Sequence, residues 1–270
     1  MTLVLALAFG ALIGLRLGAL GGGGSILAVP VLVYALQQSP TQATTGSLVV
    51  VGATSLIGAV AAYRAGHVLL ARGAAFGAVA LGGAVVGAKL AAHVPEPVLL
   101  ASFAVLMLVV AAVMTLRLLR PDRHTSGRVA LDDPIITFSP TFACQCPRAL
   151  KVLITATVVG LLTGFLGVGG GFLVVPALLL ALALPMEYAA GTSLVVITMT
   201  SAVALAVRAG AGVAPDWWLV LTLTAASAVG AVVGVRIASR TDTRPLQIAF
   251  TVLVLAVAVY TAARAFPALF

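Results

Sequence analysis

Charged side chains are scarce in this sequence: lysine, arginine, aspartate and glutamate together make up 8% of its 270 residues. A water-soluble domain carries about a quarter charged residues, so this chain has too few to cover its surface in water. Hydrophobic residues amount to 62%, in apolar runs that recur from one end to the other. The composition therefore predicts a polytopic integral membrane protein that contacts membrane lipid, and it excludes a globule with a single anchor.

Acidic residues are the scarcest charged group, with seven in the whole chain. All of them fall in or beside predicted loops: Glu96, Asp122, Asp132, Asp133, Glu187, Asp216 and Asp242. A cation pathway is disfavoured, because ion-coupled carriers usually place a carboxylate in mid-membrane. The apolar segments also lack a nucleophile paired with a base, so we do not expect an enzyme.

The chain has two cysteines, Cys144 and Cys146, in a single C-x-C pair. Without a second pair they cannot complete a tetrahedral zinc site. We interpret them as incidental loop residues, with a redox or metal role as the alternative, and expect no cofactor. The net charge of +8 comes from basic residues scattered between apolar segments, which is typical of the positive-inside bias and not of a nucleic-acid partner.

What the sequence does contain is an internal repeat. Residues 18–51 align without a gap on residues 164–197 at an offset of 146, and GAVVGAKL at 83–90 recurs as GAVVGVRI at 230–237. Each copy opens with a glycine cluster that interrupts its helices. Duplicated, glycine-broken halves in so apolar a chain are typical of secondary transporters.

Each repeat contains five apolar segments, which predicts an all-α fold. The domains are a first membrane repeat (1–118), a linker (119–148) and a second membrane repeat (149–270). The segments are 2–17, 26–37, 44–62, 68–91 and 98–118 in the first, and 149–163, 171–184, 190–207, 217–237 and 246–266 in the second. The second segment of each repeat is shorter than the roughly 20 residues that span a membrane. We therefore expect helical hairpins that meet near the membrane midplane, either re-entering or crossing as short tilted spans.

The distribution of basic residues predicts the orientation. One side collects Arg64, Arg72, Arg117, Arg120, Arg123, Arg128, Arg148, Lys151, Arg236, Arg240 and Arg244, and the other only Lys89, Arg208 and Arg264. The positive-inside rule places the first group in the cytoplasm and both termini outside. Because five segments per repeat is an odd number, the second repeat enters the membrane inverted.

The glycine clusters are the strongest candidate site: Gly21, Gly23, Gly24 and Ser25 in the first repeat, and Gly167, Gly169, Gly170 and Gly171 in the second. Each opens a short apolar helix with a proline, Pro30 or Pro176. A helix start exposes unpaired N–H groups and the positive end of the helix dipole, which together bind anions. The alternative is close helix packing, as at Gly14, Gly18, Gly160 and Gly164. We favour a site for a small anionic substrate.

Two further features accompany the clusters. Hydroxyl groups precede or open the third segment of each repeat: Thr44, Thr45, Ser47, Thr192 and Ser193. They either cap that helix or donate to an oxyanion. Arg16 is the one charge placed well inside an apolar segment, and it either adds charge to the anion cavity or snorkels to the interface.

The motif G-x-x-G-x-G-G-G-x-x-x-x-P, followed by A-x-G-T-S, resembles the TauE/SafE family of membrane proteins. The second repeat carries it in full: Gly164, Gly167, Gly169, Gly170, Gly171, Pro176, Ala189, Gly191, Thr192 and Ser193. The first departs from it at Ser25 and at Thr45-Gly46-Ser47, and Arg16 stands where the family is apolar, so no family role transfers to it. The resemblance implies transport of sulfite, sulfonates or related sulfur oxyanions across the bacterial inner membrane, commonly as export.

We therefore expect an exporter of a small sulfur oxyanion, with both termini in the periplasm. Two alternatives stay open. One is proton-coupled uptake of sulfate or thiosulfate through His67 or His93. The other is a non-transporting membrane scaffold for cytochrome or metal-centre assembly, with the two cysteines as its functional feature. The sequence leaves open the anion, the direction of transport and whether the chain forms a homo-oligomer.

Overall fold

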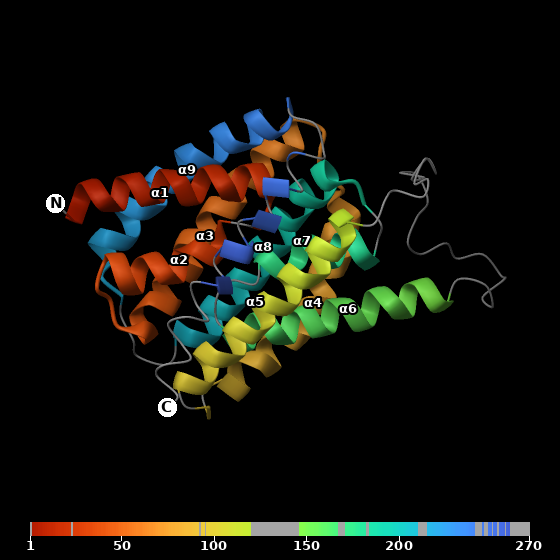
Figure 1. Cartoon of the computed structure of the whole chain (residues 1–270), viewed down its shortest axis with the longest axis horizontal. Helices are drawn as coiled ribbons and strands as arrows, with labels where there is room; N and C mark the ends of the chain where they lie inside the picture. The colour runs from red at the N-terminus through yellow and green to blue at the C-terminus, as the bar shows by residue number, and fades with distance from the viewer. Residues whose placement is uncertain are drawn as a thin grey trace.

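A computed structural model describes residues 2–22, 24–91, 93–94, 96–119, 146–166, 171–181, 184–209 and 215–240, with separate positions between 245 and 259. In these ranges every regular element is helical (Figure 1). The linker expected at 119–148 lies almost wholly outside the described residues, and so does much of the tenth apolar segment. The all-helical fold class is confirmed.

The helices follow the predicted apolar segments closely. The first half contains α1 (Thr2–Leu20), α2 (Ser25–Pro30) continuing into a π-helical turn η1 (Val31–Ala35), α3 (Pro40–Arg64), α4 (Leu70–Ala91) and α5 (Glu96–Leu119). The second half contains α6 (Cys146–Leu166), α7 (Gly171–Ala181), α8 (Met186–Ala209) and α9 (Trp217–Ala238). Within the described residues α3, α4, α8 and α9 are long and apolar enough to cross a membrane, and α1 and α6 contribute shorter apolar stretches. The chain is therefore a multi-pass membrane protein by length and composition.

The first glycine cluster reverses the chain between α1 and α2. Gly21 has a φ of +73°, a left-handed conformation that side chains disfavour. A Cβ on Gly24 would overlap the carbonyl oxygen of Ile13, so α2 folds back against α1. Pro30 then removes a backbone donor, and the next turn widens so that the Leu36 N–H reaches the Val31 oxygen at 3.0 Å. These breaks explain why α2 is too short to span.

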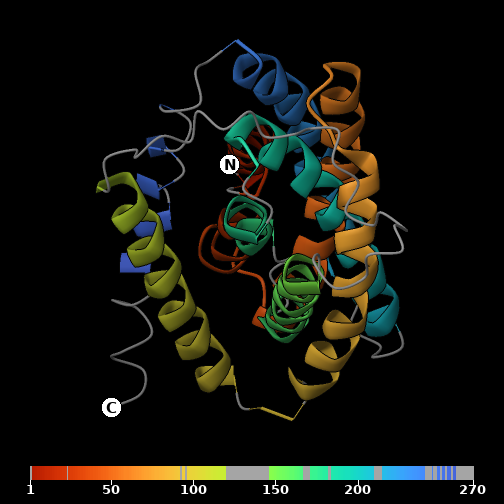
Figure 2. The same cartoon turned by 90° about the vertical axis from the view of Figure 1, so that its right-hand side faces the viewer.

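In the second half α7 is also short, with 11 residues, as many as α2 and η1 have together. The residues of α7 from Leu173 to Leu179 are all buried. Figure 2 shows the reason, since α7 lies in the middle of the bundle with α5 on one side and α4 on the other. A helix that is apolar on every face either lies in a protein interior or faces lipid, and α7 takes the interior position.

Small residues hold α1 against α9, which lie side by side in Figure 1. A Cβ on Gly14 would overlap the backbone of Ser227, and one on Gly18 would overlap that of Ala231. Both positions advance by four residues, so the two helices run parallel. The Ser227 hydroxyl also donates to the Gly10 carbonyl at 2.9 Å across the interface. Such close approach replaces the hydrophobic effect between helices in a membrane.

The same arrangement recurs between α4 and α6. Gly160 packs on the backbone of Ala80, and Gly164 on that of Ala84. These helices also run parallel. Each pair joins the first helix of one half to the fourth helix of the other, so the two halves interlock and do not stand beside each other as separate bodies.

The centre of the bundle is the crossing of α3 and α8. A Cβ on Gly52 would lie 3.2 Å from the Cβ of Ser201, and one on Gly58 would lie 3.2 Å from a Leu194 methyl group. The contacting residue on α3 rises from 52 to 58 while its partner on α8 falls from 201 to 194, so these two helices run antiparallel.

Replacing Gly14 or Gly160 with valine should disrupt the bundle, because the new side chain meets the backbone of the neighbouring helix. We expect a loss of at least the ~3 kcal/mol at the upper end of core overpacking, measured as a lower thermal unfolding midpoint in detergent. Gly82→Val is the matched control, since nothing lies within 4 Å of a Cβ there. Equal unfolding midpoints for all three variants would contradict this packing.

Candidate functional site

The first residues of α2 and α7 meet inside the bundle. A Cβ on Gly171 would lie 2.8 Å from the Ser25 hydroxyl and 2.8 Å from a methyl group of Ile197. Ser25 and Gly171 correspond to each other in the repeat alignment, at the offset of 146. Ile197 lies at the middle of α8, so the two helix starts touch near half the length of a spanning helix.

The turn before α2 lies against the start of α8. A Cβ on Gly21 would lie 2.5 Å from both the Ser193 hydroxyl and the carbonyl oxygen of Ala190. Gly21, Ser25, Gly171 and Ser193 are all buried. The structure thus brings four of the predicted site residues, from both halves, into one region.

The other predicted glycines either lie outside the described residues or pack elsewhere. Gly23, Gly167, Gly169 and Gly170 lie outside the described residues. Gly24 is packed on α1 near Ile13 and Leu17. A larger residue at Gly24 would therefore open the α1–α2 hairpin, so the position is unsuited to testing anion binding.

The serine hydroxyls of the site are already engaged with nearby carbonyl groups. Ser25 donates to the Gly22 oxygen at 2.7 Å, Ser193 to Ala190 at 2.7 Å, and Ser47 to Thr44 at 2.8 Å. In each case the partner is three residues earlier. To donate to an anion, each hydroxyl would have to rotate away from its carbonyl.

Two backbone donors at the start of α2 are engaged as well. The Ser25 N–H reaches the Gly22 oxygen at 3.2 Å, and the Leu27 N–H reaches the Gly24 oxygen at 3.1 Å. An anion at this helix start would compete with these long local bonds, which are weaker than those of a regular helix.

The expectation that Thr44, Thr45 or Ser47 caps the third helix is wrong. α3 begins at Pro40, with Ser39 as its N-cap accepting from the Gln42 N–H at 3.4 Å. The hydropathy pattern missed this first turn because it is polar. α8 likewise begins at Met186, before Thr192 and Ser193.

Thr192 serves a different helix. Its hydroxyl oxygen accepts from the Leu69 N–H at 3.1 Å, and a Cβ on Gly73 would lie 3.0 Å from its methyl group. Leu69 immediately precedes α4, so Thr192 caps α4 from α8. Because Thr192 is an acceptor in this bond, its own proton stays available for another partner.

Arg16 lies in the last two turns of α1 and is half-buried. Among the described residues no carboxylate lies within ion-pair distance of it, and it lines neither of the cavities below. Its two interpretations, an added charge for the anion cavity or snorkelling, both stay predictions.

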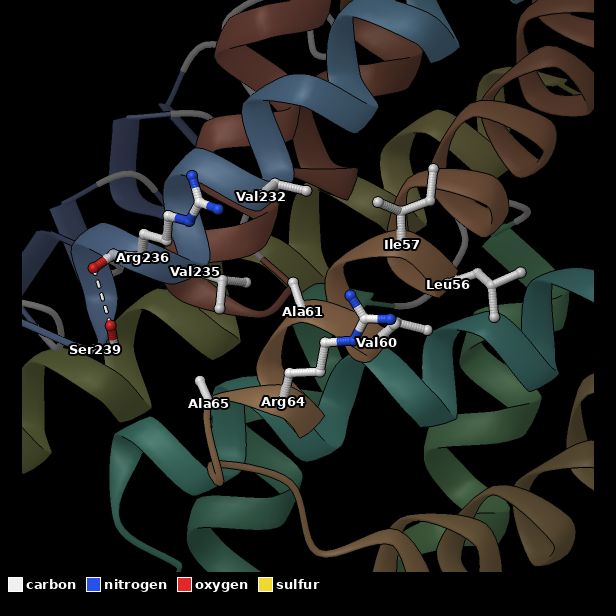
Figure 3. A pocket seen from close by; sticks show the side chains of 10 residues that line it. All are labelled: Leu56, Ile57, Val60, Ala61, Arg64, Ala65, Val232, Val235, Arg236 and Ser239. Carbon is white, nitrogen blue, oxygen red and sulfur yellow. Dashed lines mark hydrogen bonds between the residues drawn. The ribbon is translucent and has the colours of Figure 1, made fainter.

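The large cavity lies away from the glycine clusters, between the C-terminal ends of α3 and α9 (Figure 3). It measures about 610 Å³ and combines apolar walls with the exposed side chains of Arg64 and Arg236. A second, small cavity of about 20 Å³ shares Val235 and Ser239 with it and extends to Ala190, whose backbone abuts Gly21. The two cavities therefore share part of their lining, and the smaller one lies on the side of the glycine turn.

The residues of the alternative hypotheses are spread apart. The His67 ring meets Tyr188 edge-on with centroids 5.9 Å apart, and His93 Nδ1 lies 3.0 Å from the Lys89 oxygen. Cys146 opens α6, whereas Cys144 lies outside the described residues. In the part of the chain that the structure describes, no three histidine, cysteine or acidic residues come together.

Sequence reasoning missed a set of buried polar groups. The amide of Gln38 and the hydroxyls of Thr54, Ser55 and Ser201 are buried, with no hydrogen-bond partner among the described residues. A signal was present for the hydroxyls, because Thr54-Ser55 recurs as Thr200-Ser201 at the same offset of 146, in the middle of apolar segments.

Comparisons with known proteins place this chain among membrane transporters of one family. The family model "Sulfite exporter TauE/SafE" matches residues 6–261 of the chain. Two proteins of Xylella fastidiosa, from strains 9a5c and Temecula1 / ATCC 700964, are each described as "Probable membrane transporter protein". They are 31% and 30% identical to this chain over 271 residues, covering 99% of this chain and 98% of each relative. No solved structure gives a significant match.

Thr192→Val should destabilise the protein, because the Leu69 N–H loses its acceptor while the side-chain shape is kept. The expected loss is about 1–3 kcal/mol, measured as a lower unfolding midpoint. Thr192→Ser retains the hydroxyl and should remain close to wild type. A valine variant as stable as wild type would show that this bond contributes little.

Proposed function

This chain belongs to the TauE/SafE family and is a membrane transporter, and we propose that it exports a small sulfur oxyanion such as sulfite or an organosulfonate. The observation that carries the proposal is the contact between Ser25 and Gly171. It joins the starts of two helices, one from each half, at half the length of α8.

The physical basis is the polarity of a helix start. The N–H groups of the first turn and the positive end of the dipole attract an anion without any basic side chain. Two starts that face each other can hold one anion between them. We propose that the site comprises Gly21, Gly23, Gly24, Ser25, Gly167, Gly169, Gly170 and Gly171, with hydroxyls from Thr44, Thr45, Ser47, Thr192 and Ser193.

We also propose that the two halves are inverted repeats. α3 and α8 correspond in the sequence alignment and yet cross antiparallel, which favours a two-fold axis in the membrane plane. The α1–α9 and α4–α6 pairs exchange under the same operation. With the positive-inside rule, this arrangement puts both termini in the periplasm and the ends of α3 and α9 in the cytoplasm.

That orientation gives the anion a route from the cytoplasm. Arg64 and Arg236 stand at the cytoplasmic ends of α3 and α9, where the large cavity opens (Figure 3). Two positive charges there would raise the local concentration of anions. The small cavity then leads toward Gly21 and Ser193.

Export needs no coupling ion in this scheme. A membrane potential contributes roughly 2.3 kcal/mol per charge per 100 mV, and an inside-negative potential drives anions outward. The positions of the described acidic residues support export without a coupling ion, since Glu96, Glu187 and Asp216 all lie at helix ends. Asp216, for example, caps α9 by accepting from the Trp218 N–H at 3.1 Å.

In proteoliposomes the wild-type protein should carry labelled sulfite at a rate set by the membrane potential and unaffected by a pH gradient. Proton-coupled uptake through His67 or His93 predicts a strong dependence on the gradient. The scaffold hypothesis predicts no flux at all. Replacing Cys144 and Cys146 with serine should leave flux intact.

Ser193→Ala and Gly171→Ala should both weaken sulfite binding, measured by calorimetry on the purified protein. A lost hydrogen bond to a charged group is worth about 1.5–3 kcal/mol, so Ser193→Ala should reduce affinity tenfold or more. Gly171→Ala narrows the space between the helix starts, since its Cβ would press on Ser25 and Ile197. Gly82→Ala, in open space, is the control. Wild-type sulfite affinity in both variants would show that the binding site lies elsewhere in the protein.

The predicted orientation can be tested with Cys144 and Cys146, the two native cysteines of the chain. In spheroplasts a membrane-impermeant maleimide should not label Cys144 or Cys146, whereas inside-out vesicles should be labelled. A variant with both replaced by serine and with His93→Cys provides the opposite control, labelled from outside. Labelling of the native cysteines in intact spheroplasts would refute the topology.

A further inference from the structure

Three buried hydroxyl groups in the middle of the bundle have no hydrogen-bond partner in the described part of the chain. They belong to Thr54 and Ser55 on α3 and to Ser201 on α8. Their side chains are 0%, 0% and 1% exposed. An unpaired hydroxyl is costly in any protein interior, and more so at membrane depth, where water does not compensate.

These hydroxyls differ from the others in the spanning helices. A serine or threonine within a helix commonly donates to a carbonyl three or four residues earlier. Thr163, Thr198 and Thr224 do so here at 2.6 to 2.8 Å. So does Thr200, the counterpart of Thr54, which reaches the Val196 oxygen at 3.0 Å. The local helix geometry therefore allows the bond, and Thr54, Ser55 and Ser201 do not make it.

The three groups lie where the two halves cross. A Cβ on Gly52 would lie 3.2 Å from the Cβ of Ser201, at the antiparallel contact of α3 and α8. Ser201 is one helical turn after Ile197, on the same face of α8. Because Ile197 touches Gly171, the hydroxyl of Ser201 lies one turn beyond the meeting point of the helix starts.

The first half repeats this spacing. Ser55 follows Val51 by four residues, and Val51 and Ser55 are the counterparts of Ile197 and Ser201 in the alignment. Val51 is fully buried as well. The sequence repeat thus gives α3 a hydroxyl one turn after Val51, as Ser201 follows Ile197 on α8.

We propose that Thr54, Ser55 and Ser201 form a second binding station for the transported oxyanion, adjoining the helix starts. This inference rests on the proposed function and adds residues that the family motif does not contain. Three hydroxyl donors match the three oxygen atoms of a sulfite or sulfonate group. Because the donors are neutral, they replace part of the anion's hydration and still release it, as a transport step requires. The α3–α8 crossing joins the two halves, so their relative movement would assemble or separate the station.

The test compares Thr54→Val, Ser55→Ala and Ser201→Ala with the matched control Thr200→Val in purified full-length protein. Unfolding midpoints are measured without ligand and with sodium sulfite, and sulfite affinity is measured by calorimetry. Without ligand, the three variants should melt at or above the wild-type temperature, because each removes an unpaired buried group. Their sulfite affinity should fall tenfold or more, and the stabilisation by sulfite should shrink. Thr200→Val should keep wild-type affinity, since Thr200 belongs neither to the proposed station nor to the proposed site at the helix starts.

The outcomes separate this inference from the proposed function. Wild-type affinity in the three variants, with lower unfolding midpoints, would overturn the station and show a structural role, while the proposed function survives. A wild-type protein that binds neither sulfite nor taurine would overturn both. Sodium chloride is compared with choline chloride in parallel. If sodium chloride alone raises the unfolding midpoint, and Ser55→Ala and Ser201→Ala abolish this effect, the three hydroxyls bind a cation and the oxyanion station is wrong.

Discussion

The structure depends on covering two helix starts inside the membrane. α2 and α7 begin within the bundle, where the first N–H groups of a helix have no intrahelical partner and lipid offers none. The protein meets this constraint by placing the starts against each other, Ser25 on Gly171, and by burying α7 on every described face. The same requirement that keeps lipid away from the breaks creates a polar region that lipid cannot reach.

The surrounding helices make this cover possible by packing at backbone distance. α1 lies on α9 and α6 lies on α4, each through glycines that leave no room for a side chain. Since each pair takes one helix from either half, neither half can bury its own hairpin alone. α3 and α8 cross beside these pairs and contribute buried hydroxyl groups, those of Thr54, Ser55 and Ser201. Packing and the candidate site are therefore parts of one arrangement, and most of the glycines that the structure describes lie against a neighbouring helix or turn.

Much of the fold could be predicted from the sequence, because apolar runs and glycine breaks act locally. In the part of the chain that the structure describes, the α-helices from α1 to α9 fall on predicted apolar segments, the short α2 and α7 among them. The helix starts at Pro40 and Met186 escaped prediction, because Thr41 and Gln42 in one first turn and Glu187 in the other lower the local hydropathy. Family membership, too, could be recognised from the duplicated glycine motif, which the match over residues 6–261 supports.

For the candidate site, too, the sequence determined one part and the tertiary structure another. Sequence alone determined which residues could bind an anion, since glycines, hydroxyls and helix starts have that chemistry wherever they stand. Only the tertiary structure decided their partners: Thr192 caps α4 by accepting from the Leu69 N–H, 123 residues earlier in the chain, and Gly24 closes a hairpin. It also decided that Thr54 has no hydrogen-bond partner among the described residues, while Thr200, its counterpart, bonds to the Val196 oxygen. The reason is physical, because a hydrogen bond or a close contact depends on which surfaces meet, and distant segments meet only when the whole bundle packs.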